Sequence, residues 1–209
     1  MIDAISLESA HLLGDALAAA HRLRFRIFVE RQKYQVPSRR GMEWDQFDTP
    51  GAVYLLWRDE ARRVRAVARL IPTDLPYMIR ELWPHLAGGH DLPVCEDVWE
   101  VSRVGIDRTL DPEVRARILG ELFCGLAEFG LANGIREYLC VTLAQVVDHA
   151  LLRAGVAAER MGEPVRLGRL PVVAVRLPVS HEGLRRLRRY HRIGGAVLRV
   201  AGEAVARAA

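Results

Sequence analysis

The N-terminal part of the chain repeats apolar residues at a helical spacing. Between residues 8 and 30, apolar side chains recur every three or four positions, which predicts an amphipathic helix; they are Leu12, Leu13, Ala16, Leu17, Ala20, Leu23 and Ile27. Residues 32–50 are polar and contain Pro37, Gly41 and Pro50, so they predict a long loop. Long loops in compact domains are usually functional or mobile.

Short apolar runs follow the loop. Residues 52–58 and 64–71 predict two strands, and the short turn between them predicts an antiparallel hairpin. Further strands are predicted over residues 98–106, 136–143 and 170–178, and helices over 77–87, 112–133 and 145–154. This order predicts a three-layer α/β/α sandwich with a mixed, mostly antiparallel sheet. Asp111 as N-cap, Pro112 at the first position and Gly134 beyond the end delimit the longest helix.

Charge sets the C-terminal segment apart. The chain has 209 residues, which suits a single domain over 1–209, and its net charge is +4. Residues 181–209 contain Glu182, Glu203 and seven arginines, which gives this segment a net charge of +5. Residues 1–180 therefore have a net charge of 4 − 5 = −1. The arginines are at positions 185, 186, 188, 189, 192, 199 and 207. We expect a basic helical extension broken near Gly194-Gly195. A solvated helix face is favoured over a docking patch for an acidic partner. Nucleic acid is not expected, because only Tyr190 interleaves with these arginines.

Composition excludes several classes of protein. The chain has no apolar run near the roughly 18 residues of a membrane helix, and its first residues do not resemble a signal peptide, so we expect a cytoplasmic protein that binds no membrane. Cys95, Cys124 and Cys140 lack the spacing of a disulfide framework or a zinc site. The histidines show no ligand spacing either, and no metal is expected.

Charged residues gather in and around the long loop. Glu43, Asp45 and Asp48 lie within six positions and would repel each other without a cation among them. Possible cations are Arg24 and Arg26 before the loop, and Arg69 and Arg103 on predicted strands. Glu100 and Arg103 are three positions apart, so they face opposite sides of a strand unless a bulge lies between them. These residues alone fit either a ligand pocket or a structural surface network.

The order of these residues resembles the LuxI-type acyl-homoserine lactone synthases. The similarity covers about residues 20–160 and rests on five segments: Arg24-x-x-x-Phe28, Tyr34, Gly41-Met42-Glu43-x-Asp45-x-Phe47-Asp48, Arg69-Leu70-x-Pro72-Thr73 and Glu100-x-Ser102-Arg103. The resemblance implies a fold similar to the GNAT N-acetyltransferases. It also implies transfer of an acyl group from an acyl thioester to the amine of S-adenosylmethionine, followed by lactone closure and release of methylthioadenosine, which makes a quorum-sensing signal.

The resemblance also implies roles for particular residues. Arg24, Asp45, Asp48 and Arg103 would form the electrostatic cluster of the S-adenosylmethionine site, with Arg69 shaping it. Phe28 and Tyr34 would line that site. Glu43 or Glu100 would help to remove the proton from the attacking amine, through a water. The acyl tunnel would be lined by Trp83, Val104, Gly105 and either Val141 or Thr142.

The chemistry is consistent with this set of side chains. An α-amine has a pKa of about 8, so a carboxylate-held water is a plausible proton acceptor. The fixed charge of a sulfonium suits acidic groups and aromatic faces, and an arginine binds a carboxylate with two hydrogen bonds. Strand amides near a bulge suit the oxyanion, and intramolecular lactone closure has a high effective molarity. No metal or other cofactor is required.

Three positions depart from the family pattern. Tyr34 replaces a usual Trp, Trp83 lies near a usual Phe, and Val104-Gly105-Ile106 follow Arg103 where bulky aromatic residues are common. The smaller residues after Arg103 lead to the hypothesis of a branched, aromatic or otherwise unusual acyl group, unless Trp44, Trp83 or Trp99 restores the missing volume.

Other features leave alternatives open. No acetyltransferase pyrophosphate loop is present, so the acyl donor is either acyl-CoA or an acyl-carrier protein. The alternative function is a GNAT-type N-acyltransferase acting on another amine, which would not need the charged cluster. A non-enzymatic binding module would leave that cluster unexplained.

Overall fold

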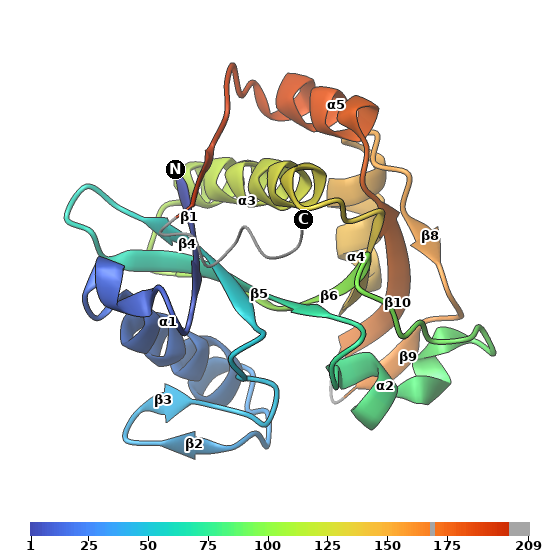
Figure 1. Cartoon of the computed structure of the whole chain (residues 1–209), viewed down its shortest axis with the longest axis horizontal. Coiled ribbons are helices and arrows are strands. Elements are labelled where there is room, and N and C mark those ends of the chain that lie inside the picture. The colour runs from blue at the N-terminus through green and yellow to red at the C-terminus, as the bar shows by residue number, and fades with distance from the viewer. Residues whose placement is uncertain (168–169, 201–209) are drawn as a thin grey trace.

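A nine-stranded mixed sheet forms the centre of the molecule (Figure 1). The computed structural model describes residues 1–167 and 170–200. The strand order is β11-β1-β4-β5-β6-β7-β10-β8, with β9 also pairing with β10. The strands are β1 (Ile2–Ser6), β4 (Val53–Arg58), β5 (Val64–Pro72), β6 (Val98–Ile106), β7 (Glu137–Leu143), β8 (Glu159–Arg160), β9 (Val165–Leu167), β10 (Leu170–Pro178) and β11 (Leu198–Val200). Among the strands within residues 1–167 and 170–200, only the β1–β11 and β6–β7 pairs are parallel, which confirms the predicted mixed, mostly antiparallel sheet.

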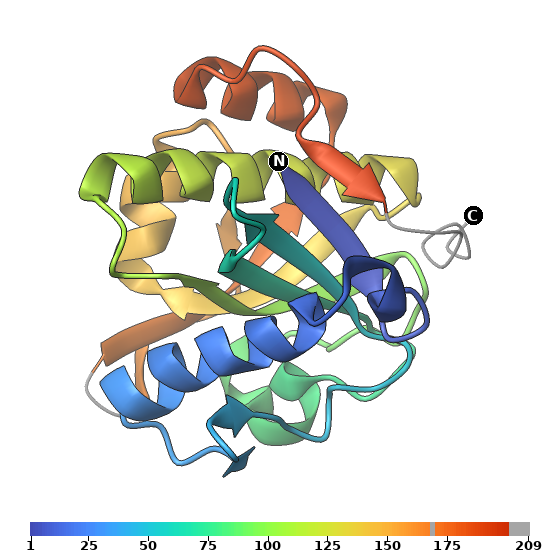
Figure 2. The same ribbon diagram turned by 90° about the vertical axis from the view of Figure 1, so that its left-hand side faces the viewer.

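Helices cover both faces of this sheet (Figures 1 and 2). The helices α3 (Pro112–Ala132) and α5 (His181–His191) lie on one face, and α1 (Ala16–Arg24) and α2 (Met78–Leu82) lie on the other. Each face has its own hydrophobic core, because alternate residues of a strand point to opposite sides. On β5, for example, Ala68 and Leu70 pack toward α3, while Val67 and Ile71 pack toward α1. The predicted three-layer arrangement is therefore confirmed.

The N-terminal region is more divided than its apolar pattern predicts. The helix expected over residues 8–30 is split at Gly14 (φ 63°) into a 3₁₀ turn (Ala10–Leu13) and α1, which continues as a π-helix (Phe25–Arg31). The sequence did not predict β1. All five of its residues are buried, and a strand buried on both faces has no polar–apolar alternation.

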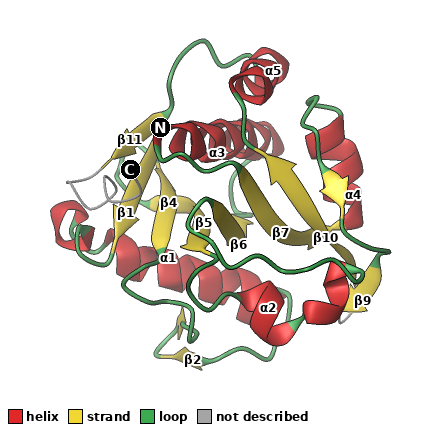
Figure 3. Ribbon diagram, turned by 45° about the vertical axis from the view of Figure 1, so that its right-hand side comes forward, coloured by secondary structure: helices red, strands yellow, loops and turns green. Residues whose placement is uncertain are grey.

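The predicted loop over residues 32–50 contains a small hairpin of β2 (Ser38–Arg39) and β3 (Met42–Glu43). Its tip, Arg40 and Gly41, has positive φ angles of 51° and 71°. The hairpin lies beside α1 on the same side of the sheet (Figure 3). It brings the acidic residues of the loop back toward the helix that precedes them.

Most of the later elements agree with the predictions. Residues 77–87 form α2 and a 3₁₀ turn (Pro84–Ala87), and 145–154 correspond to α4 (Ala144–Val146) with a π-helix (Val147–Leu152). Asp111 directly precedes α3, but its side chain makes no capping hydrogen bond. No described helix has the length and apolarity needed to cross a bilayer.

The C-terminal extension, predicted as a helix broken near Gly194-Gly195, is helical only in its first part among the described residues, and a strand follows where helix was expected. The helix α5 ends at His191, followed by Arg192 in the left-handed conformation (φ 56°), and the chain then returns as β11 beside β1. The carboxylate of Glu128 on α3 accepts hydrogen bonds from the backbone amides of Val197 (2.9 Å) and Leu198 (2.8 Å), which fixes this return. Residues 201–209, with Glu203 and Arg207, lie outside the described residues.

The strands β6 and β7 separate along their length. Their parallel pairing runs from Val98 and Glu137 to Val101 and Cys140. Beyond that point, β6 continues along β5 and β7 continues along β10. The two strands therefore diverge from Ser102 and Val141 onward, and the sheet has an opening there between the backbones.

A bulge in β6 lies at the start of this opening. Val67 pairs with Gly105 but Arg69 pairs with Ser102, so β6 has one residue more than β5 over this stretch. Arg103 has a φ of 52°, in the left-handed region that a side chain rarely adopts. The bulge confirms the arrangement in which Glu100 and Arg103 can serve the same face of the sheet.

Candidate active site

Three arginines and three carboxylates meet between α1, the β2–β3 hairpin and the sheet. Arg24 ends α1, Glu43 belongs to β3, Asp45 and Asp48 follow it, and Arg69 and Arg103 come from β5 and β6. The side chains of Arg24, Arg69, Glu43 and Asp48 are fully buried, and that of Arg103 is 10% exposed. Unpaired charges are costly to bury, so the equal numbers of the two signs make this cluster possible. The structure thus brings together residues that the sequence predicted as one site.

Arg24 is bound by carboxylates on two sides. Its Nε donates to Glu43 Oε2, while Nη1 and Nη2 donate to Asp48 Oδ1 (2.6 Å) and Oδ2 (3.0 Å). Burial lowers the pKa of Arg24, but the hydrogen bonds with Asp48 and Glu43 outweigh burial and raise it above the ordinary value. Arg24 is therefore a permanent cation that fixes two acids in place.

Arg69 and Arg103 share the remaining acid positions. Arg69 Nη1 donates to Asp45 Oδ1 (2.5 Å) and Asp48 Oδ1 (3.0 Å). Arg103 Nη2 donates to Asp45 Oδ2 (2.7 Å), and its Nε donates to Glu43 Oε1 (3.1 Å). Each carboxylate is thus bound by two arginines, and Arg103 is the guanidinium of the three that reaches the surface.

Asp48 is held ionised by this network. Burial raises the pKa of Asp48, but the hydrogen bond and charge of Arg24, with the charge of Arg69, bring it well below its ordinary value. The Tyr54 hydroxyl also donates to Asp48 Oδ1 (2.8 Å), and the backbone amide of Asp45 donates to Oδ2 (2.9 Å). Asp48 is therefore an anion that organises the cluster.

Aromatic rings border the exposed end of the cluster. The guanidinium carbon of Arg103 lies 5.4 Å from the centre of the Phe28 ring, and Tyr34 stacks on Phe28 with ring centres 6.3 Å apart. Both residues were predicted to line this site. Two electron-rich rings beside acidic groups suit an organic cation.

Glu100 lies next to the cluster but is turned toward α2. Its Oε2 and Oε1 accept hydrogen bonds from the backbone amides of Met78 (3.1 Å) and Ile79 (2.7 Å). Burial raises the pKa of Glu100, and these two amides and the nearby arginines oppose that change. This carboxylate anchors the start of α2 and has a higher proton affinity than an ordinary glutamate.

The predicted tunnel residues lie on both sides of the opening between β6 and β7. Trp83 and Val141 pack against the core on the α1 side, and Val104 packs against the core on the α3 side. Gly105 lies directly against Ile27, since an added Cβ would be 2.6 Å from Ile27 Cδ1. Thr142 alternates with Val141 and so faces the α3 side.

The structure adds three residues that the sequence analysis missed. Tyr54 looked like an ordinary strand residue. Met78 places its sulfur 3.1 Å from Arg69 Nη2 and 3.3 Å from Arg103 Nη1. His21 is buried beside Glu43. His21 lies three positions before Arg24, so helical spacing is the signal that would have linked them.

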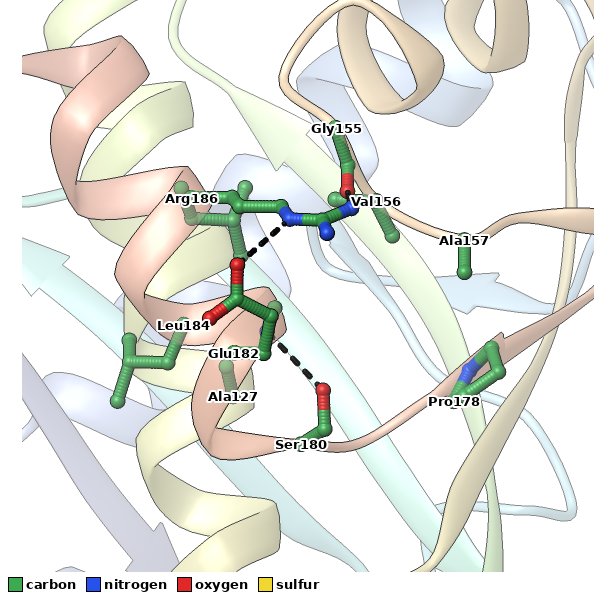
Figure 4. A pocket seen from close by; sticks show the side chains of 11 residues that line it. Ala127, Gly155, Val156, Ala157, Pro178, Ser180, Glu182, Leu184 and Arg186 are labelled. Carbon is green, nitrogen blue, oxygen red and sulfur yellow. Dashed lines mark hydrogen bonds and ion pairs between the residues drawn. The ribbon is translucent and has the colours of Figure 1, made fainter.

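Two surface pockets lie away from this cluster. One, of about 230 Å³, is formed by α3, α5 and the segment after the second π-helix (Figure 4). Its polar groups bind one another, since Glu182 accepts from Arg186 (2.9 Å) and Ser180 accepts from the amide of Gly183 (3.0 Å). The other, of about 350 Å³, lies near Arg117 and Gly194. Neither contains a predicted site residue.

Comparison with known proteins places this arrangement in a family. The model of the autoinducer synthase family matches residues 10–187. The chain belongs to the autoinducer synthase family. An acyl-homoserine-lactone synthase of Rhizobium radiobacter is 33% identical over 175 residues, which are 82% of each chain. The enzyme is accordingly an acyl-homoserine-lactone synthase, an acyltransferase, as the resemblance of its motifs implied.

Solved structures agree with this assignment. The CoA-dependent acyl-homoserine lactone synthase BjaI, in complex with S-adenosylmethionine and isopentyl-CoA, has a TM-score of 0.87 at 30% identity and matches 100% of this chain and 98% of its own. A protein from Lactobacillus plantarum described as an N-acetyltransferase matches 86% of this chain and 99% of its own with a TM-score of 0.56 at 16% identity, which shows the fold alone. The GNAT-like fold is therefore confirmed.

Proposed function

We propose that this synthase binds S-adenosylmethionine at the Arg103 end of the charged cluster and acylates its amine with an acyl group from acyl-CoA. The observation that carries the proposal is the meeting of charged side chains from α1, β3, the loop after β3 and β6, namely Arg24, Glu43, Asp45, Asp48 and Arg103. A surface network would not need complete burial of these groups. A binding site for a zwitterionic cation needs acids, an arginine and aromatic rings fixed in advance.

Within this site the residues have different roles. Arg103 binds the substrate carboxylate, because it is the partly exposed guanidinium of the cluster. Glu43 and Asp45 face the cationic end, and Phe28 and Tyr34 cover the sulfonium and its substituents. Arg24 and Arg69 bind Asp48 and the other two acids, and among the described residues none of the three pairs with the partly exposed Arg103, so they hold the other groups in position.

Glu100 is the better candidate for proton acceptor of the two predicted glutamates. Both carboxylate oxygens of Glu43 are already engaged, one by Arg24 and the other by Arg103. The raised pKa of Glu100 brings it closer to that of an amine, and so makes it a more effective base through a water. The nitrogen lone pair then attacks the thioester carbonyl, and the thiolate leaves.

The opening between β6 and β7 suits the thioester. Backbone amides of the bulge are not used in β6–β7 pairing, so they can donate to the oxyanion that forms on attack. After acylation, the substrate carboxylate displaces methylthioadenosine from the sulfonium carbon and closes the lactone. Both reacting groups belong to one molecule, which favours this step.

A basic surface beside the same opening supports acyl-CoA as the donor. Burial and the charges of Arg108 and Arg115 lower the pKa of Arg31, so these arginines are near enough to repel one another. Arg115 is in the first turn of α3, where helix amides also attract anions. The phosphates of CoA would neutralise this surface.

The acyl-carrier protein is the less favoured donor. Several arginines of α5 are engaged within the chain, since Arg185 and Arg186 pair with Glu182, and Arg188 pairs with Glu128. These pairs reduce the positive charge that α5 offers to an acidic carrier.

The acyl group is proposed to be short and branched. Val104 and Gly105 have less side-chain volume than the aromatic residues usual at these positions in the family, and Ile27 packs against Gly105 and so bounds this end of the opening. The related BjaI was solved with isopentyl-CoA. Among the tryptophans considered as compensating bulk, Trp44 is 45% exposed and Trp99 lies in the core on the α3 side, against Phe129. Of these three tryptophans, Trp83 is the one that packs against the core on the α1 side, as Val141 does.

The test is an assay of methylthioadenosine release with S-adenosylmethionine and a panel of acyl thioesters. We expect release with branched short-chain acyl-CoA and a matching lactone by mass spectrometry. Free CoA without methylthioadenosine would instead identify an N-acyltransferase of another amine. A clear preference for a straight medium-chain donor would refute the acyl-chain assignment.

The CoA assignment needs its own comparison. Arg31→Ala and Arg115→Ala should raise KM for acyl-CoA but not for the same acyl group on N-acetylcysteamine, which lacks the phosphates. Arg185→Ala on α5 is the matched control and should change neither the KM for acyl-CoA nor the KM for the N-acetylcysteamine thioester. Preference for acyl-carrier protein, with sensitivity to Arg185→Ala, would refute the CoA assignment.

A further inference from the structure

His21 holds the backbone of Glu43. It lies on α1, is 1% exposed, and places Nδ1 2.8 Å from the backbone oxygen of Glu43. A carbonyl oxygen can only accept a hydrogen bond, so Nδ1 carries the proton and donates it. His21 Nε2 is also buried and has no hydrogen-bond partner among the described residues. Its contribution to the site is therefore made through Nδ1.

The imidazole is fixed between two aromatic rings. The Trp44 ring lies 4.2 Å away at an interplanar angle of 32°, and the Tyr54 ring meets it edge-on at 5.9 Å. Trp44 is 45% exposed, so it covers the histidine from the solvent side. This packing restricts rotation of the ring and keeps Nδ1 directed at the Glu43 carbonyl.

Burial and the charge of Arg24 favour the neutral form of His21. Burial is the largest cause of its lowered pKa, and the charge of Arg24 lowers it further. Glu43 and Asp48 act in the opposite direction but are already bound to Arg24. A neutral ring avoids placing a second cation beside Arg24.

One face of α1 therefore binds the same acidic residue twice. His21 and Arg24 are three positions apart and lie on the same side of the helix. His21 binds the main chain of Glu43, and Arg24 binds its carboxylate. The second carboxylate oxygen is then presented to Arg103 at 3.1 Å.

We propose that His21 is a positioning residue for S-adenosylmethionine binding, and that it acts by fixing the main chain at Glu43 so that the Glu43 carboxylate meets Arg103 and the substrate amine. The proposal rests on the function proposed above for the charged cluster. It assigns to His21 an effect on the S-adenosylmethionine site and none on the acyl donor site.

Two amide variants separate the hydrogen bond from the shape of the side chain. The amide N–H of His21→Asn occupies about the place of Nδ1, whereas that of His21→Gln lies near Nε2 and points away from the carbonyl. We expect His21→Gln to lower kcat/KM for S-adenosylmethionine about 10-fold, equivalent to about 1.4 kcal/mol, and to leave KM for the acyl donor unchanged. His21→Asn should retain most of the activity.

A matched control is available on the same chain. His11 also places Nδ1 2.8 Å from a backbone oxygen, that of Glu8, but it is exposed and remote from the cluster. His11→Gln should leave both kcat/KM for S-adenosylmethionine and KM for the acyl donor unchanged. Thermal unfolding of each variant measures any general loss of stability. We expect the change in Tm not to correlate with the selective loss of kcat/KM for S-adenosylmethionine.

The possible results are distinct. Equal loss of activity in His21→Asn and His21→Gln, or wild-type kinetics in both, would overturn the proposal. An equal change in KM for both substrates would also overturn it, because it would indicate general loosening. Lack of lactone synthesis by the unaltered enzyme would instead refute the proposed function.

Discussion

Arg103→Ala is the substitution that best separates catalysis from folding in this enzyme. The side chain is 10% exposed, and its removal leaves Glu43 bound to Arg24 and Asp45 bound to Arg69. Neither acid becomes an isolated buried charge. The left-handed backbone at this position is equally unfavourable for alanine, so backbone strain does not change.

The expected stability cost follows from these contacts. Breaking a buried ion pair costs about 3–5 kcal/mol when a charge is left unpaired. Because both acids here retain a partner, we expect about 1.5–3 kcal/mol, the range of a single hydrogen bond to a charged group. For a chain of this size that corresponds to a fall in Tm of roughly 3–12 °C.

The catalytic loss should be much larger. Removing one member of a buried, hydrogen-bonded charge pair costs a ligand about 2–5 kcal/mol, and we expect the upper part of this range because Arg103 also positions Glu43. This predicts a decrease in kcat/KM for S-adenosylmethionine of at least about 100-fold.

The assay combines methylthioadenosine release with thermal unfolding. Arg58→Ala is the matched control, because Arg58 Nε binds Asp3 at 2.7 Å and its side chain is 12% exposed, but it lies on β4 away from the cluster. It should lose similar stability and keep its activity. Unfolding of Arg103→Ala at the assay temperature, or activity within about 10-fold of wild type, would refute this reasoning.

Three further predictions concern stability and specificity. Arg24→Ala should cost about 3–5 kcal/mol in urea titrations, because it removes three hydrogen bonds to Glu43 and Asp48 and empties a fully buried position, although each acid keeps one other arginine; a loss no larger than that of Arg103→Ala would contradict this. The free energy of unfolding should fall as pH drops below 6.5, because His21 takes up a proton more readily in the unfolded chain than when it is buried. It should fall again toward and below pH 3.8, because Asp48 is protonated in the unfolded chain at a higher pH than in the folded one. Asp48→Asn should flatten this second, acidic part of the stability–pH curve, and an unchanged curve would contradict the prediction. Gly105→Ala should displace the end of Ile27 at a cost of about 1–3 kcal/mol and reduce kcat/KM for branched donors more than for acetyl-CoA; equal effects on both would separate Gly105 from acyl selection.

The fold was predictable where each element has its own pattern. The helix over 112–133 and the strands over 98–106 and 170–178 have lengths, periods or terminal residues that identify them locally. The strands β1 and β11 were missed, because each is short and is fixed by distant partners. Glu128, which anchors β11, is some seventy positions away and has no local signal.

The site was predictable in membership but not in detail. Residue types and order linked Arg24, the acidic loop and Arg103, since each motif is short and specific. Which acid binds which arginine depends on the hairpin and the bulge, and neither can be read from spacing alone. The bulge was left open as an alternative, and Arg103 at a positive φ resolved it.

The return of the chain as β11 has a practical consequence for shortened versions of this enzyme. A version ending at residue 191 would keep every charged residue of the cluster. It would, however, make β1 an exposed edge strand, and the backbone amides and carbonyls that pair with β11 would be free to pair with another molecule. Such a protein should self-associate as its concentration rises, even though its catalytic groups are intact. The last described strand thus protects the sheet from joining its neighbours.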